Sequence, residues 1–214
     1  VSATTSYSYR VRAANAEGFS LSSNQANVTT PMETPTGLTA AAPTFSAVLL
    51  TWTDNSIVES SFKVERSTNG GPFSQIASVA ANSTSYSDAA VAAENTYAYR
   101  VRGANGTGFS AYSAEVTVTT RPEAPTDLTA AAPTSVQAVL GWTDAASTEV
   151  SYRIERSVGG GAFVEIASVG PNTTSYTDTA TTELTTYSYR IRVENAGGFS
   201  TYSTQANVTT PIAA

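Results

Sequence analysis

The chain has 214 residues, of which 41% are hydrophobic and only 13% charged, so it can bury real cores and is not a disordered tail. Its net charge of −6, without any run of Lys or Arg, argues against a nucleic-acid partner and against an anionic membrane surface. It has no cysteine and no histidine, which excludes disulfides, thiol catalysis and Cys/His metal sites.

The first predicted element lies in YSYRVRAANAEGFS, residues 7–20, and it is repeated further along the chain. Near copies begin at Tyr97 and Tyr187, so the three stand 90 residues apart. Self-similarity at a fixed period is typical of tandem copies of one module. We therefore predict three parts: 1–31 as the C-terminal third (strands F and G) of a preceding repeat (repeat 1), 32–121 as a complete domain (repeat 2) and 122–214 as a second complete domain (repeat 3).

Within each repeat the hydrophobic pattern alternates with a period of two. In TYAYRVR, residues 96–102, every second side chain is large and apolar, which predicts a half-buried strand. Similar runs are AVLLTW, FKVERS, PFSQIASV, TSYSD and YSAEVTVTT, separated by clusters of Asn, Gly, Pro, Asp and Ser. With the segment after Pro35, this makes about seven strands per repeat, which favours a sandwich of two antiparallel sheets.

Several short motifs resemble those of a known family. They are Pro-x-x-Leu in the first strand, the tryptophan of the second strand, Tyr-x-Tyr-Arg-Val/Ile-Arg, Asn-x-x-Gly-Phe-Ser and a closing Val-Thr-Thr. In these marks the whole chain resembles tandem fibronectin type III domains of the bacterial secreted or cell-surface type. The resemblance implies an all-β fold of tandem seven-stranded immunoglobulin-like (fibronectin type III) β-sandwiches, and it implies no particular function, since this module recurs in unrelated proteins.

Two sets of aromatic residues are expected to be structural. Trp52 and Trp142 should fill the space between the sheets. A tyrosine corner is expected at the start of each Tyr-x-Tyr motif, with the hydroxyl bonded to a buried backbone acceptor upstream, at Tyr7, Tyr97 and Tyr187.

The charged residues of the central strands are expected to form exposed cross-strand ion pairs of low energy. These are Arg100, Arg102, Arg190 and Arg192 beside Lys63, Glu65, Arg153 and Glu155. A polyanion site on the arginines is the alternative.

No constellation of catalytic residues is present, so we predict that the chain is not an enzyme and holds no cofactor. The acids Asp54, Asp144, Asp88, Asp178, Glu65 and Glu155 are dispersed over different loops and faces, whereas a glycosidase needs two carboxylates across one cleft. Short acids at strand ends more often bind turn N–H groups. Calcium at Asp54/Asn55 or Asp144 is an alternative that lacks an oxygen-rich loop.

The loop between the last two strands is the candidate contact surface. Its aromatic residues are Phe19, Phe109 and Phe199, followed by Tyr112 and Tyr202 in the next strand. They either pack against the neighbouring domain or meet a partner or a sugar. Arg102-Gly103-Ala104 lacks the Asp of an integrin-binding motif.

Each predicted linker contains two prolines, which restrict the backbone and favour a semi-rigid rod. We therefore predict a non-catalytic structural array, a spacer or fibre-forming stalk of an extracellular or cell-surface protein, with its export signal outside these residues. The expected partners are neighbouring repeats of a longer chain and, in a fibre, copies of itself. The alternative is a binding module for carbohydrate or a host surface, in an adhesin or beside a secreted glycoside hydrolase.

Overall fold

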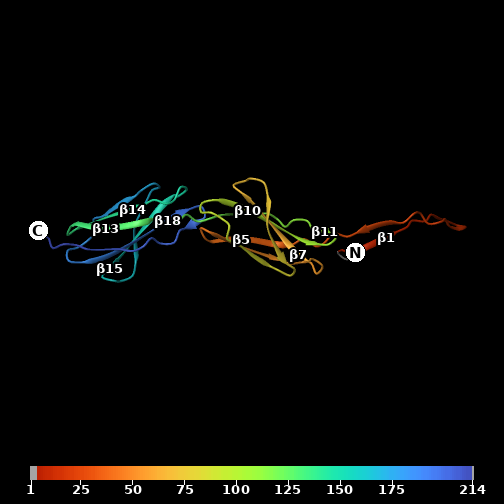
Figure 1. The fold of residues 1–214 in the computed structure, drawn as a ribbon, viewed down its shortest axis with the longest axis horizontal. Helices are drawn as coiled ribbons and strands as arrows, with labels where there is room; N and C mark the ends of the chain where they lie inside the picture. The colour runs from red at the N-terminus through yellow and green to blue at the C-terminus, as the bar shows by residue number, and fades with distance from the viewer. Residues whose placement is uncertain (1–3, 214) are drawn as a thin grey trace.

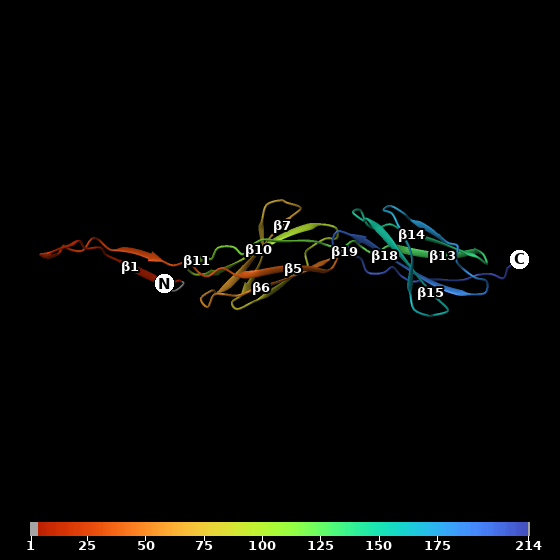
Figure 2. The same cartoon turned by 180° about the vertical axis from the view of Figure 1, so that it is seen from behind.

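A computed structural model describes residues 4–213, and every element in this part of the chain is a β-strand. Figures 1 and 2 show the three repeats following one another along the longest axis of the molecule. No helix of the described residues has the length and apolar character needed to cross a membrane.

Repeat 1 is a long antiparallel hairpin. Strand β1 pairs with β4, and β2 pairs with β3 nearer the tip. The bounds are β1 (Ser6–Tyr9), β2 (Ala14–Asn15), β3 (Gly18–Phe19) and β4 (Ala26–Thr29). Its apolar side chains are largely open to solvent: Tyr9 is 52% exposed, whereas Tyr99 and Tyr189, at the same position of repeats 2 and 3, are fully buried.

Repeat 2 is a sandwich of two antiparallel sheets. The first sheet has the order β5-β6-β9, and the second has the order β8-β7-β10, with β11 and β12 both paired to β10. The first contains β5 (Thr36–Thr44), β6 (Ala47–Thr53) and β9 (Ser85–Asp88). The second contains β7 (Ser61–Thr68), β8 (Ser74–Ala80), β10 (Thr96–Asn105), β11 (Gly108–Phe109) and β12 (Val116–Thr119).

Repeat 3 has the same topology with every element shifted along the chain. Its first sheet is β13 (Thr126–Thr134), β14 (Gln137–Thr143) and β17 (Ser175–Asp178). Its second sheet is β15 (Ser151–Val158), β16 (Val164–Val169), β18 (Thr186–Asn195), β19 (Gly198–Phe199) and β20 (Ala206–Thr209).

These sheets confirm the all-β sandwich predicted from the alternating pattern. The domain boundaries at 31/32 and 121/122 stay a prediction. One local feature differs from the expectation: Phe109 and Phe199 lie in two-residue strands that extend the hairpin of β10 and β18, rather than in an open loop.

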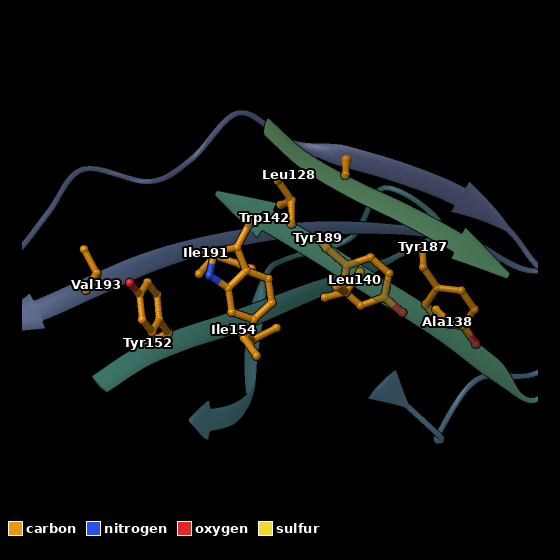
Figure 3. Packing of buried hydrophobic residues seen from close by; sticks show 11 residues of the cluster. Leu128, Ala138, Leu140, Trp142, Tyr152, Ile154, Tyr187, Tyr189, Ile191 and Val193 are labelled. Carbon is orange, nitrogen blue, oxygen red and sulfur yellow. The ribbon is translucent and has the colours of Figure 1, made fainter. Parts of the chain in front are cut away.

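The core of each sandwich is formed by inward-facing side chains of both sheets. In repeat 3, Trp142 of β14 packs against Tyr152 of β15 with ring centroids 5.7 Å apart, between Ile154 and Ile191 (Figure 3). Trp52 packs on Phe62 at the same distance in repeat 2. Both indoles are about 95% buried, at 4% and 6% exposure. Large apolar area is therefore removed from water where the sheets face each other.

Met32, in the segment that leads into repeat 2, is buried beside a glycine of β10. A Cβ atom added to Gly103 would lie 2.6 Å from Met32 Sδ, closer than any real contact of this kind. At the same positions of repeat 3 stand Pro122 and Val193, both buried. Repeat 2 thus has a long side chain and a glycine at these two positions, where repeat 3 has a proline and a valine.

This complementarity predicts a rescue experiment. We expect Gly103→Val to destabilise repeat 2 by about 1–3 kcal/mol, because the new methyl groups meet Met32 in a filled space. Adding Met32→Ala should recover most of that loss. Urea denaturation followed by tryptophan fluorescence in a Trp142→Phe background, where Trp52 alone reports, would measure both. Equal stability of the single and double variants would contradict the proposed contact.

Candidate functional site

The strongest candidate surface is the outer face of the sheet that contains β7 and β10. There, two arginines of β10 alternate with three aromatic rings from other segments. The guanidinium carbon of Arg100 lies 4.1 Å from the ring centre of Phe73 and 3.9 Å from that of Tyr112. That of Arg102 lies 4.4 Å from Tyr112 and 3.9 Å from Phe109. We call these five residues the ladder of repeat 2.

The same ladder is built in repeat 3. Arg190 lies 4.2 Å from Phe163 and 3.8 Å from Tyr202, and Arg192 lies 5.0 Å from Tyr202 and 4.2 Å from Phe199. Stacking of a guanidinium on an aromatic face is favourable in both repeats. In repeat 1 only its outermost step is formed among the described residues, with Arg12 4.8 Å from Phe19.

A glutamate lies beneath each ladder and is held by three partners. Glu65 accepts two hydrogen bonds from Arg100, at 2.9 and 2.7 Å, and one from the Tyr112 hydroxyl, and Arg102 lies 3.6 Å away. Glu155 has equivalent contacts with Arg190, Tyr202 and Arg192. The glutamates are only 8% and 6% exposed.

The expectation of exposed ion pairs was therefore wrong for these two acids. The alternation did place Glu65 and Glu155 on the outer face of the sheet. A tyrosine from the segment before the last strand folds over each of them and removes it from water. The sequence signal that could have indicated this burial is the tyrosine that recurs at the 90-residue spacing, Tyr112 and Tyr202.

The buried Glu155 predicts a pH-dependent contribution to stability. Burial raises its pKa, but the hydrogen bonds from Tyr202 and Arg190 and the charges of Arg190 and Arg192 outweigh burial, so the pKa lies below the ordinary 4.5. A lowered pKa means a contribution that is present above about pH 4.5 and lost as the pH falls through the folded-state value. We expect the difference in unfolding free energy between the wild type and Glu155→Gln to shrink below pH 4.5, in urea titrations at several pH values. A difference that grows on acidification would contradict this.

A second repeated network lies inside the sandwich. Asp88, at the end of β9, accepts hydrogen bonds from Arg66 Nη1 at 2.8 Å and from the Tyr99 hydroxyl at 2.9 Å, and its other oxygen accepts the Ala90 N–H at 3.0 Å. Asp178, Arg156, Tyr189 and Ala180 form the same network in repeat 3. Asp88 and Asp178 are 1% and 2% exposed, and burial beside Asp88 raises the pKa of Tyr99 above its usual range.

The remaining acids named from the sequence are not brought together. Asp54 Oδ1 accepts the N–H of Ser56, and Asp144 Oδ1 accepts the N–H of Ala146, each at 2.9 Å, as turn-capping acids do. Within residues 4–213 no group of three or more acidic side chains is arranged to hold a metal ion.

The tyrosine corner is present in repeats 2 and 3, with the direction of its hydrogen bond reversed from the expectation. The Tyr97 hydroxyl accepts the N–H of Ala92, and the Tyr187 hydroxyl accepts the N–H of Thr182, each at 2.8 Å. For Tyr7 the residue at the position of Ala92 is Ser2, which lies outside the described residues.

This geometry predicts the effect of removing one oxygen atom. Tyr97→Phe keeps the ring but leaves the Ala92 N–H without its acceptor, so we expect a loss of about 1–3 kcal/mol in repeat 2. The measurement is the urea midpoint reported by Trp52 in a Trp142→Phe background. Tyr86→Phe, at a partly buried tyrosine of the same repeat, is the control. An unchanged midpoint for Tyr97→Phe would remove the corner.

The aromatic residues predicted as contacts lie mainly within the ladders. Tyr112 and Tyr202 each have two guanidinium groups of their own ladder within 5.0 Å of the ring centre. Phe109 ends its ladder and stays 54% exposed, beside a hollow lined with Thr29, Pro31 and Met32 at the join to repeat 1. Phe19 is 70% exposed, and Phe199 is partly buried. A contact role for these residues stays a prediction.

The repeated sandwich, with its buried tryptophan, tyrosine corner and Greek-key order of strands, defines the class of immunoglobulin-like β-sandwich modules. Residues 123–209 match the family model of the Fibronectin type III domain. The chain resembles a solved two-fibronectin type-III domain segment from chicken tenascin, with a TM-score of 0.54 at 18% identity, over 82% of this chain and 99% of that one. Residues 123–209 therefore match the fibronectin type III family, and repeats 2 and 3 together have the fold of tandem fibronectin type III β-sandwiches.

A curated relative is Exoglucanase B of Cellulomonas fimi, which is 31% identical over an alignment of 235 residues. The alignment covers 98% of this chain but only 21% of the relative. Fibronectin type III domains are in general non-catalytic modules, and the match to this enzyme is confined to a fifth of its length.

Proposed function

We propose that the chain is a spacer: a semi-rigid row of fibronectin type III domains that holds other parts of an extracellular protein at a distance. The observation that carries this proposal is the arrangement of the repeats along one axis (Figure 1). Further support comes from the ladders and the buried aspartates, because their arginine, tyrosine and aspartate side chains are engaged by contacts within their own repeat. Repetition then adds length without adding chemistry.

The relative favours one of the three kinds of parent protein considered from the sequence, which are a fibre, an adhesin and a secreted glycoside hydrolase. Exoglucanase B matches this chain over nearly all of its residues while most of that enzyme lies outside the match. We infer that the present domains serve in the accessory region of a secreted glycoside hydrolase, rather than in a fibre or an adhesin. In that setting they separate a catalytic domain from the next domain of the same protein.

The test of the spacer role combines shape and activity. We expect small-angle X-ray scattering of the 214-residue chain to give an elongated particle, and purified chain to release no sugar from cellulose or other glucans. A compact particle would overturn the rod. Turnover that disappears with Asp54→Asn or Asp144→Asn would overturn the non-catalytic assignment.

Carbohydrate binding is the second candidate, and the exposed rings of Phe109 and Phe19 favour it. Co-sedimentation with insoluble cellulose separates the two roles. A spacer stays in the supernatant. Retention that is lost in Phe19→Ala/Phe109→Ala, but kept in the exposed aliphatic control Val164→Ala, would assign a binding module instead.

A further inference from the structure

One carboxylate of repeat 2 binds two residues of repeat 3 at the junction between these repeats. Glu94, in the segment before β10, accepts the N–H groups of Ser147 and Thr148 at 2.9–3.1 Å, and both of their hydroxyls, at 2.6 and 3.1 Å. Glu94 has a φ of 60°. Leu184, at the same position of repeat 3, has a φ of 51°, so this turn forms with either side chain. The carboxylate is thus specific to the junction and not needed for the turn.

A glycine permits a second contact at this junction. A Cβ atom added to Gly197 would lie 2.5 Å from the carbonyl oxygen of Thr119 and 2.7 Å from that of Thr120. Beside it, the side-chain N–H of Asn195 donates to the Thr120 carbonyl at 3.2 Å. The loop before β19 therefore lies directly on the C-terminal end of repeat 2, and only glycine fits at position 197.

The junction between repeats 1 and 2 has other residues in place of Glu94, Ser147, Thr148 and Gly197, whereas Asn105, Thr29 and Thr30 repeat Asn195, Thr119 and Thr120. Thr4 stands in place of Glu94, Ile57 and Val58 in place of Ser147 and Thr148, and Thr107 in place of Gly197. Ile57 is 96% exposed. Thr107 occupies the same turn as Gly197, since the N–H of each is bonded to the asparagine two residues earlier, at 2.9 and 2.7 Å. The Cβ atom of Thr107 excludes the close approach to two backbone carbonyl groups that Gly197 makes with Thr119 and Thr120.

We propose that Glu94, Ser147, Thr148 and Gly197 form a lock that makes the junction of repeats 2 and 3 stiff, while the junction of repeats 1 and 2, which lacks it, is a hinge. The N-terminal end of repeat 3 is then a docking surface for a fibronectin type III domain with a carboxylate at the position of Glu94. The order of the repeats is consequently not interchangeable. This inference deepens the proposed spacer role by locating its stiff joint.

The experiment measures the distance between spin labels on the two repeats of the full chain. Because the chain has no cysteine, labels can be placed by Ser85→Cys and Ser175→Cys, two exposed strand positions. The lock predicts one narrow distance distribution. Glu94→Leu and Gly197→Thr should each broaden it about twofold, since domains joined without a specific interface move relative to each other. Both new residues already occur at these positions in another repeat, so the repeats themselves should stay folded.

Two matched variants serve as controls. Glu123→Gln removes a charge from an exposed linker residue, and Thr107→Gly loosens the corresponding loop of repeat 2; both should leave the distribution narrow. A broad distribution in the wild type would overturn the lock, and so would an unchanged one in Glu94→Leu and Gly197→Thr. A compact particle in small-angle X-ray scattering, together with a narrow spin-label distribution, would refute the spacer role and leave the lock in place. Failure of the spacer role can therefore be told apart from failure of the lock.

Discussion

Asp178→Ala is expected to lower the unfolding free energy of repeat 3 by about 3–5 kcal/mol, because it leaves the guanidinium of Arg156 without its buried partner. The same change removes the acceptor of the Tyr189 hydroxyl and of the Ala180 N–H, and Arg156 keeps only its hydrogen bond to the Ala180 carbonyl. Urea denaturation reported by Trp142 in a Trp52→Phe background measures the effect.

The control for this prediction is an ion pair nearer the surface of the same repeat. Glu165, at 43% side-chain exposure, lies 3.2 Å from Arg153. Glu165→Ala should cost less than about 1 kcal/mol, as exposed pairs do. If both alanine variants cost the same, burial would not be the reason for the importance of Asp178.

Trp142→Ala should have an effect of similar size, about 3–5 kcal/mol, because it empties the space between the two sheets of repeat 3. Amide exchange that proceeds through global opening in β14 and β18 should then be faster by about 10²–10⁴-fold. Hydrogen exchange of the full chain, followed by mass spectrometry of peptides from both repeats, would measure this. Peptides from repeat 2 provide the internal reference.

Trp142→Phe distinguishes loss of volume from loss of the indole N–H. That N–H has no hydrogen-bond partner among the described residues. The phenylalanine variant should therefore lose only part of the buried area and stay well above the alanine variant in stability. An equal loss in both would mean that the ring does not fill the core.

The fold could be predicted because the local pattern and the repeat agree. The alternation in TYAYRVR and the turn residues between the runs both predict a series of half-buried strands. The single tryptophan of each complete repeat marks the core that these strands enclose. The short strand at Phe109 was missed because two residues are too few to show a period. The short strand forms because the chain turns back after β10, so that Gly108 and Phe109 pair with the last residues of β10.

The ladder could be predicted only in part. Its arginines were assigned to the outer face, as the structure shows, but the burial of Glu65 depends on Tyr112, 47 residues later in the chain. Alternation with a period of two predicts which face of the sheet a residue occupies. It does not predict whether a side chain from a distant segment covers that face. The same limit applies to Asp88, whose partners Arg66 and Tyr99 come from two other strands.

The exchange of Met32 and Gly103 for Pro122 and Val193 also bears on how the chain avoids misfolding. Neighbouring domains of similar sequence can trade strands while they fold, and such domain-swapped products are a typical failure of repeat proteins. If β18 took the place of β10, Val193 would meet Met32 in a space made for a glycine. If β10 took the place of β18, Gly103 would leave a gap where the fully buried Val193 side chain belongs to the core of repeat 3. Each sandwich therefore disfavours the strand of its neighbour, although the two repeats share their topology.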